Sequence, residues 1–265
     1  MSEARAYAKI RLARPEGEPG VLRITLAVPE RRNAIGPQMV NELLWALADA
    51  HEDASVRAIV LTGDGKAFCA GGDFGQMSGS GDGATLPPKG DYADLLLAMV
   101  RTEKPIVARV NGAAMGGGLG LVAASTFAVA AEDATLGTPE VNVGLFPMMI
   151  MAVLARLVPR RKLLEMMLLG QKTTAAEALA LGLVNRVVPA GELDAAVAAI
   201  TTELAKKSPL TLALGLRAFA AQDDLDLEAA LPLLRGKLAE ILGTEDAQEG
   251  LLAFLEKRSP VWKGR

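Results

Sequence analysis

The sequence predicts an α/β protein of 265 residues whose C-terminal part is entirely helical. Short apolar segments typical of strands alternate with helical segments up to about residue 190, an order that favours a largely parallel sheet. Beyond Leu193 only helical spacing remains. We therefore divide the chain into an α/β core, residues 1–195, and a helical C-terminal region, residues 196–265. The hydrophobic share of 51% suits a protein with a large buried core.

Strands are expected where apolar residues alternate with polar ones or form a short run. The first lies at residues 21–28, where Leu22, Ile24 and Leu26 share one face. Apolar runs predict the others, at residues 56–61, 106–110, 127–130 and 184–188.

Helix signals fill the intervals between these strands. Pro37 opens the first helix, since a first helical turn tolerates proline. Thr174 and Glu177 form a capping-box pattern before a helix at residues 175–181. Residues 75–90 contain five glycines and two adjacent prolines, which predicts a mobile surface loop. Helices of the C-terminal region are expected at residues 193–205, 210–222, 227–242 and 247–257.

Composition excludes several kinds of chemistry. The chain has 28 basic and 31 acidic residues, a formal charge of −3, which gives no general attraction to nucleic acid or to an anionic membrane. The single cysteine, Cys69, and the single histidine, His51, exclude a disulfide framework and a Cys- or His-rich metal site. We expect no metal, no secretory signal and no membrane span, and therefore a cytoplasmic protein. Carboxylates and backbone amides are left to carry any catalysis.

Two glycine-rich turns follow predicted strands. Residues 115–120 read M-G-G-G-L-G, and from Gly118 the string matches a dinucleotide-binding pattern. Residues 111–117 separate that string from its strand, which argues against a nicotinamide site and leaves tight helix–sheet packing as one interpretation. The favoured interpretation is anion binding, because glycine-rich backbone at a helix start leaves N–H groups free to stabilise an oxyanion. A second such turn occupies residues 69–73.

Four sequence blocks together resemble the enoyl-CoA hydratase/isomerase (crotonase) family. They are G-K-A-F-C-A-G-G-D-F at residues 65–74, N-G-A-A-M-G-G-G-L-G at 111–120, G-T-P-E-V-N-V-G-L-F-P at 137–147 and F-L-E-K-R at 254–258. The resemblance implies a spiral of ββα units and a helical C-terminal region that forms a homotrimer, often a dimer of trimers. It also implies a coenzyme A thioester as the substrate, with no separate cofactor.

The resemblance also assigns roles to individual residues. Gly72 and Gly117 match the two amides of the family's oxyanion hole, and Glu140 matches the second of two catalytic glutamates. Phe254 and Lys257 match family positions that reach the substrate, often in a neighbouring subunit. For Lys257 a solvated charge on a terminal helix remains an equal alternative to substrate binding. The implied substrate-binding residues are Arg31, Arg32, Ala34, Ala70, Asp73, Phe74, Gly75, Gly116, Phe254 and Lys257.

One departure from the family pattern leaves the reaction open. The first family glutamate falls on Gly120, which has no carboxylate. Glu140 follows a proline among apolar residues, where desolvation raises a carboxyl pKa toward the range of a general acid or base. Near it, Met148, Met149 and Met151 are expected beside an acyl chain or in ordinary core packing.

The overall pattern favours an enoyl-CoA hydratase, while the missing carboxylate favours an isomerase that uses Glu140 alone. A non-catalytic acyl-CoA-binding member remains a third interpretation, and the net charge argues against an RNA-binding one. Decarboxylation, dehalogenation and thioester hydrolysis also occur on this scaffold.

Overall fold

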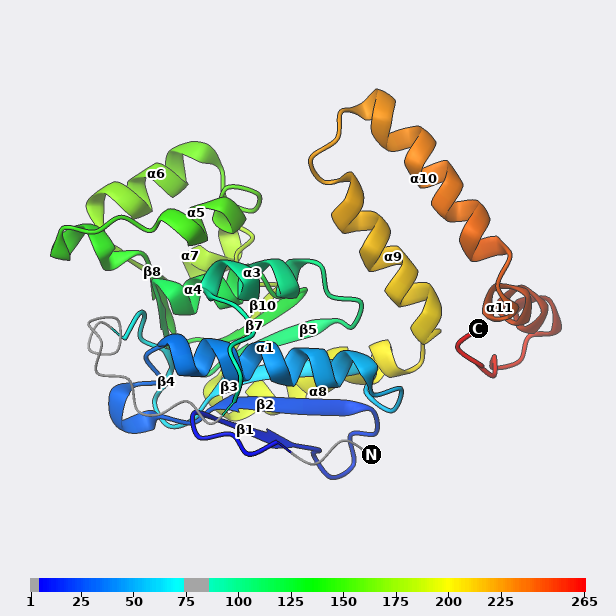
Figure 1. Cartoon of the computed structure of the whole chain (residues 1–265), viewed down its shortest axis with the longest axis horizontal. Helices are drawn as coiled ribbons and strands as arrows, with labels where there is room; N and C mark the ends of the chain where they lie inside the picture. Colours follow the sequence, from blue (N-terminus) through cyan, green and yellow to red (C-terminus); the bar gives the residue numbers. More distant parts are fainter. Residues whose placement is uncertain (1–4, 74–85) are drawn as a thin grey trace.

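A computed structural model describes residues 5–73 and 86–265 (Figure 1). Within these residues the larger of two sheets has six strands, in the order β1-β2-β3-β5-β7-β10. Its neighbouring strands are parallel except for β1 and β2. The strands are β1 (Ile10–Ala13), β2 (Val21–Leu26), β3 (Ala58–Gly63), β5 (Ile106–Val110), β7 (Phe127–Ala131) and β10 (Arg186–Val188).

The smaller sheet has the order β4-β6-β8-β9 among the described residues. Strands β4, β6 and β8 are parallel to one another, and β9 is antiparallel to β8. Each has only three residues, which is too short for an alternating pattern to be recognised, so sequence inspection missed all four. The strands are β4 (Ala67–Cys69), β6 (Ala113–Met115), β8 (Thr135–Gly137) and β9 (Lys172–Thr174).

Helices of the core cover both faces of the larger sheet. α1 packs on β1 and β2, whereas α8 packs on β3, β5 and β7. The helices of this part are η1 (Pro29–Arg31), α1 (Pro37–Glu52), α3 (Tyr92–Val100), α4 (Gly117–Ala123), η2 (Pro139–Val143), α5 (Met148–Leu154), α6 (Arg160–Leu169), α7 (Ala175–Ala180), η3 (Ala190–Glu192) and α8 (Leu193–Ala205).

The chain order is a repeated β-β-α unit. β3 and β4 precede α3, β5 and β6 precede α4, and β7 and β8 precede η2 and α5. In each unit the first strand joins the larger sheet and the second joins the smaller one. This is the order implied by the resemblance. Because the second strands of the three units, β4, β6 and β8, are adjacent and parallel, the residues that follow them meet at one edge of the smaller sheet.

Three further helices, α9 (Pro209–Gln222), α10 (Leu227–Leu242) and α11 (Glu245–Glu256), pack on one another and extend away from the sheets (Figure 1). The predicted helices at 193–205 and 227–242 are confirmed at both ends. α9 and α11 begin one and two residues earlier than predicted, because the Ser208 and Thr244 side chains accept hydrogen bonds from the backbone of their first turns. The division near residue 195 stays a prediction.

Other elements also match the predictions from the sequence in part. The strand at residues 106–110 is confirmed, and the other predicted strands shift by up to two residues at an end. Thr174 and Glu177 form the predicted capping box of α7. β1 was not predicted, because only its first residue is buried and no alternation results. None of the helices within the described residues is long and apolar enough to cross a membrane.

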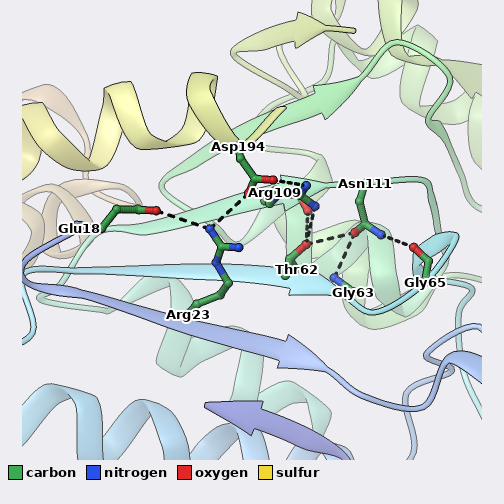
Figure 2. Close-up of polar contacts among 8 residues, drawn as sticks. All are labelled: Glu18, Arg23, Thr62, Gly63, Gly65, Arg109, Asn111 and Asp194. Carbon is green, nitrogen blue, oxygen red and sulfur yellow. Dashed lines mark hydrogen bonds and ion pairs between the residues drawn. The ribbon is translucent and has the colours of Figure 1, made fainter. Parts of the chain in front are cut away.

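A polar network on the face of the larger sheet that carries α8 joins this helix to β2 and β5 (Figure 2). The Arg109 guanidinium donates to both carboxylate oxygens of Asp194, at 2.9 Å each, and Arg23 approaches the same carboxylate at 3.2 Å. Asn111, just after β5, accepts from the Gly63 N–H at 3.1 Å and donates to the Gly65 carbonyl at 3.0 Å. The turn between β3 and β4 is therefore held against the end of β5.

Asn33 supports the same turn from the other side. Its side chain is fully buried, accepts from the Val28 N–H at 3.0 Å, and donates to the carbonyls of Asp64 and Ala67 at 2.9 Å each. Its φ of 55° lies in the left-handed region, which asparagine tolerates better than most residues.

We predict that Asn33→Ala lowers the free energy of unfolding by about 3 kcal/mol, because three backbone groups lose a hydrogen bond and, among the described residues, only the Ala67 carbonyl keeps another, from Asn111 at 3.4 Å. Asn33→Gly should lose the same bonds but recover about 1 kcal/mol, since glycine has no penalty at positive φ. Urea denaturation of the two variants measures both the loss of the side-chain hydrogen bonds and the gain from glycine at positive φ. Wild-type stability in Asn33→Gly would show that the side-chain bonds contribute nothing.

Candidate active site

The edge where β4, β6 and β8 end brings together the main groups singled out in the sequence. The carboxyl ends of adjacent parallel strands lie side by side, a common place for ligand sites in α/β proteins. β4 leads to Gly72, β6 leads to Gly117, and β8 leads to Glu140. Three segments far apart in the chain are thereby placed next to one another.

The first glycine turn leaves one amide free. The Ile35 N–H donates to the Gly71 carbonyl at 2.8 Å, and the Asp73 N–H donates to the Ile35 carbonyl at 2.9 Å. Gly72, between them, pairs with Ile35 in a parallel bridge, so its own N–H points to the opposite side. In the described part of the chain this N–H has no acceptor.

An ion pair and backbone bonds hold this turn against the loop after η1. Arg31 lies 2.8 Å from the carboxylate of the buried Asp73. The Ala70 N–H donates to the Arg32 carbonyl at 2.9 Å, and the Ala34 N–H donates to the Arg31 carbonyl at 3.1 Å. The structure thus brings together the five residues from these two segments that the sequence suggested for substrate binding.

The second glycine turn connects β6 to α4. The Gly116 N–H donates to the Gly137 carbonyl at 2.9 Å, and Gly116 has a φ of +48°, a region that favours glycine. Gly117 is the first residue of α4, where backbone N–H groups have no partner inside the helix. Its N–H has no acceptor among the described residues.

The two turns are in direct contact. A β-carbon placed on Gly118 would lie 2.4 Å from the Cys69 carbonyl oxygen, and one on Gly71 would lie 3.4 Å from the Met115 carbonyl oxygen. Gly118 is therefore required for close packing of α4 on β4. Cys69 is fully buried, and burial raises the pKa of its thiol to about 12.

Glu140 lies against the second turn. A β-carbon on Gly116 would lie 2.7 Å from Glu140 Oε1, so the absence of a side chain at Gly116 makes room for the carboxylate. The other oxygen, Oε2, is buried and has no hydrogen-bond partner within residues 5–73 and 86–265. Burial raises the pKa of Glu140, and a hydrogen bond from its own backbone N–H partly offsets this. The direction agrees with the expectation from its apolar neighbours.

Tyr92 is a site residue that sequence inspection missed. It is the first residue of α3, and its hydroxyl donates to the Gly117 carbonyl at 2.5 Å. The only sequence signal near it is the capping pattern of Asp91 and Asp94, which marks the start of a helix but not a function.

Exposed apolar side chains continue from Glu140 along the chain. Met148 and Met149 are 64% and 48% exposed, whereas Met151 is partly buried. Val143, at the end of η2, and Leu145, in the loop that follows, are exposed as well. A run of exposed apolar side chains is what an apolar ligand or a second chain would cover.

Two suggested residues are not brought to this edge. Phe254 and Lys257 lie in and just after α11, at the far end of the molecule from β4 and β8 (Figure 1), and Phe254 is 82% exposed. Phe74, Gly75 and most of the glycine-rich segment 75–90 lie outside the described residues. The described ranges contain no group of three or more His, Cys, Asp or Glu side chains able to hold a metal ion.

Comparison with known proteins identifies the fold as that of the crotonases and shows the family directly. The enoyl-CoA hydratase/isomerase family model matches residues 16–265. The chain belongs to the enoyl-CoA hydratase/isomerase family.

Individual relatives cover nearly the full length. The rat protein named enoyl-CoA hydratase domain-containing protein 3, mitochondrial, is 34% identical over 262 residues, which are 95% of this chain and 87% of the rat protein. The crystal structure of an enoyl-CoA hydratase from Mycobacterium smegmatis has a TM-score of 0.88 at 35% identity, covering 96% of this chain and 99% of that one. An enoyl-CoA hydratase structure from Bacillus anthracis also has a TM-score of 0.88, at 30% identity, covering 97% and 100%.

We predict that Glu140→Gln stabilises the fold near neutral pH. Because the folded pKa lies above the usual value near 4.5, the folded state binds the proton more tightly than the unfolded state. The protonated carboxyl of Glu140 therefore contributes to stability below pH 4.5, and this contribution is lost as pH rises through the folded pKa. Glutamine cannot ionise, so the variant does not lose stability in this way.

The measurement is the free energy of unfolding of both proteins at pH 4 and pH 7.5. We expect the variant to gain stability at pH 7.5 and to gain less at pH 4. Glu132→Gln, at an exposed turn, is the matched control. An equal change at both pH values would contradict the assignment.

Proposed function

We propose that the protein is an enoyl-CoA hydratase, which adds water reversibly to the double bond of a 2-enoyl-CoA. The observation that carries the proposal is the half-buried Glu140 carboxylate lying against Gly116, beside a turn whose next amide, Gly117, has no acceptor in residues 5–73 and 86–265. A carboxylate with a raised pKa next to an oxyanion-binding backbone is the combination that proton transfer at a thioester requires. The names of the relatives support the same substrate class.

The two free amides form an oxyanion hole in this proposal. The thioester oxygen accepts hydrogen bonds from the Gly72 and Gly117 N–H groups, and the dipole of α4 adds positive potential at its N-terminus. Such donors need no reorganisation when charge develops on the oxygen. The contact between the two turns keeps both donors in place.

Addition then proceeds through an enolate. The oxygen of a water molecule bonds to C3, the C2=C3 π electrons move toward the thioester oxygen, and one water proton passes to Glu140. Glu140 returns that proton to C2, which forms the C2–H bond and restores the thioester. One carboxylate can serve as base and then as acid, because the proton it takes is the proton it delivers.

Isomerisation is the second candidate, and Gly120 favours it. With no carboxylate at that position, Glu140 can move a proton between C4 and C2 of a 3-enoyl-CoA while the two amides hold the dienolate. This reaction needs no water. A non-catalytic acyl-CoA-binding protein is a third outcome, in which neither substrate is converted.

The active assembly in this proposal is a homotrimer or a dimer of trimers. Exposed leucines follow one side of α10, and α11 carries further exposed apolar side chains, a surface that another subunit would bury. Phe254 and Lys257 then reach the acyl-CoA of a neighbouring subunit, with Lys257 near a phosphate. The exposed side chains are Leu227, Leu231, Leu238, Leu242, Leu251, Leu252, Phe254 and Leu255.

We propose the cytoplasm as the location, on composition; the rat relative carries the word mitochondrial in its name. The partners in this proposal are acyl-CoA and further copies of the chain, without nucleic acid or membrane.

The deciding experiment supplies the purified protein with a 2-enoyl-CoA and, separately, with a 3-enoyl-CoA, and follows the absorbance of the conjugated enoyl thioester. A hydratase lowers it with the first substrate. An isomerase raises it with the second. No change with either substrate would leave only the binding role.

We predict that Glu140→Gln lowers kcat by about 10³-fold or more, because the amide can neither take nor deliver the proton. Affinity for an acyl-CoA, measured by calorimetry, should stay within a few-fold, since the amides that bind the thioester oxygen are unchanged. A variant with full activity would reject Glu140 as the acid and base.

A second prediction concerns the assembly. Sedimentation should give a trimer or hexamer, and Lys257→Ala should raise KM several-fold, because a phosphate loses its cationic partner. Co-expression of Lys257→Ala with Glu140→Gln should restore low-KM sites, in which Glu140 of one chain faces Lys257 of another. A monomer with full activity, or no restored sites, would contradict the shared site.

A further inference from the structure

Tyr92 and Ile150 fill the space beside Gly120, where the family resemblance leads one to expect a glutamate. A β-carbon on Gly120 would lie 2.3 Å from the Tyr92 hydroxyl oxygen and 2.4 Å from Ile150 Cγ2. Carbon atoms do not approach other atoms this closely, so no side chain fits unless both neighbours move. Gly120→Glu therefore requires Tyr92 and Ile150 to move before a second carboxylate fits.

Tyr92 is held in place at both ends. Its backbone begins α3, where the Asp91 side chain accepts from the N–H groups of Ala93 at 2.8 Å and Asp94 at 3.1 Å. The Asp94 side chain accepts from the Asp91 N–H at 2.8 Å, which completes the cap. At the other end, the hydroxyl donates to the Gly117 carbonyl at 2.5 Å.

The Tyr92 phenol stays neutral, and its hydroxyl proton is already donated to a hydrogen bond. Burial raises the pKa of Tyr92 well above 10, and the charges of Cys69 and Glu140 act in the same direction. A neutral hydroxyl has one proton to donate, and here the Gly117 carbonyl accepts it. Toward any further group the Tyr92 oxygen can only accept a hydrogen bond.

A second acceptor flanks the same turn. Glu140 Oε1 lies against Gly116, and Tyr92 contacts Gly117, the next residue along the chain. Oε2 of Glu140 is buried without a partner in the part of the chain that the structure describes. A water molecule held by both residues would donate one proton to each, which leaves an oxygen lone pair free to attack C3.

We propose that Tyr92 takes the place of the missing first carboxylate by accepting a hydrogen bond from the water molecule that adds to C3. The inference rests on the proposed hydratase function. Tyr92 positions the water and takes no proton, while Glu140 receives the proton that leaves the water and delivers it to C2.

Two reactions of the same site separate this role from a structural one. Hydration of a 2-enoyl-CoA needs the positioned water. Exchange of a C2 proton of a saturated acyl-CoA in deuterated solvent needs Glu140 and the amides but no water attack on carbon. The C2 proton passes to the carboxylate, the carboxyl proton exchanges with solvent deuterium, and a deuteron returns to C2. Tyr7→Phe is the matched control, since Tyr7 is the other tyrosine of the chain and its hydroxyl donates to Asp49 at 3.3 Å.

We expect Tyr92→Phe to lower kcat for hydration by about 10- to 100-fold, the loss of one hydrogen bond to the reacting water, with KM unchanged. C2 exchange should stay within about twofold of wild type. Tyr7→Phe should match wild type in both reactions.

Unchanged hydration in Tyr92→Phe would overturn the proposal, and so would an equal loss of both reactions, because Tyr92 would then act by placing Gly117 or Glu140. A wild-type protein that exchanges C2 protons without hydrating would reject the role of Tyr92 and the hydratase, but would keep the single-carboxylate site. A wild-type protein inactive in both reactions would reject the proposed function itself.

Discussion

The site depends on one constraint, the parallel pairing of β4, β6 and β8. Parallel neighbours end at the same edge, so the segments that follow them have no choice but to lie side by side. The Gly116 N–H bond to the Gly137 carbonyl extends this pairing by one step beyond the strands. Glu140, three residues later in a short helix opened by Pro139, is thereby delivered to the backbone of Gly116. A shift of register between β6 and β8 would separate the carboxylate from the free amide.

Glycine serves two separate purposes at this edge. At Gly116 the backbone conformation and the approach of Glu140 both exclude a side chain, whereas at Gly118 only the packing against Cys69 does. Within the described residues the amides of Gly72 and Gly117 have no acceptor, because Gly71 and Asp73 make the backbone bonds of the first turn and Gly117 stands at the start of α4. Unpaired amides, a half-buried carboxylate and exposed methionines all reduce stability relative to a fully satisfied fold, and sites of function are where such features are retained.

Family membership and reaction are separate questions in this chain. The family model and the full-length relatives agree on the fold and on the class of chemistry. The reaction depends on how a proton and a water molecule are handled once only one carboxylate remains. The space beside Gly120 is occupied by a phenol and an isoleucine, so a polar group other than a carboxylate lies at this position. That hydroxyl is why Tyr92 is the informative position.

The sequence by itself determined the α/β order, most longer helices and strands, the two glycine turns and the environment of Glu140, because periodicity, caps and local composition act within a few residues. It did not show the three-residue strands of the small sheet, whose pairing depends on partners tens of residues away. Only the tertiary structure placed Tyr92 beside Gly120, since 28 residues separate them in the chain and no local pattern marks a contact made by packing α3 on α4. The tertiary structure also decided that Phe254 and Lys257 lie away from this edge, because α11 packs on α9 and α10.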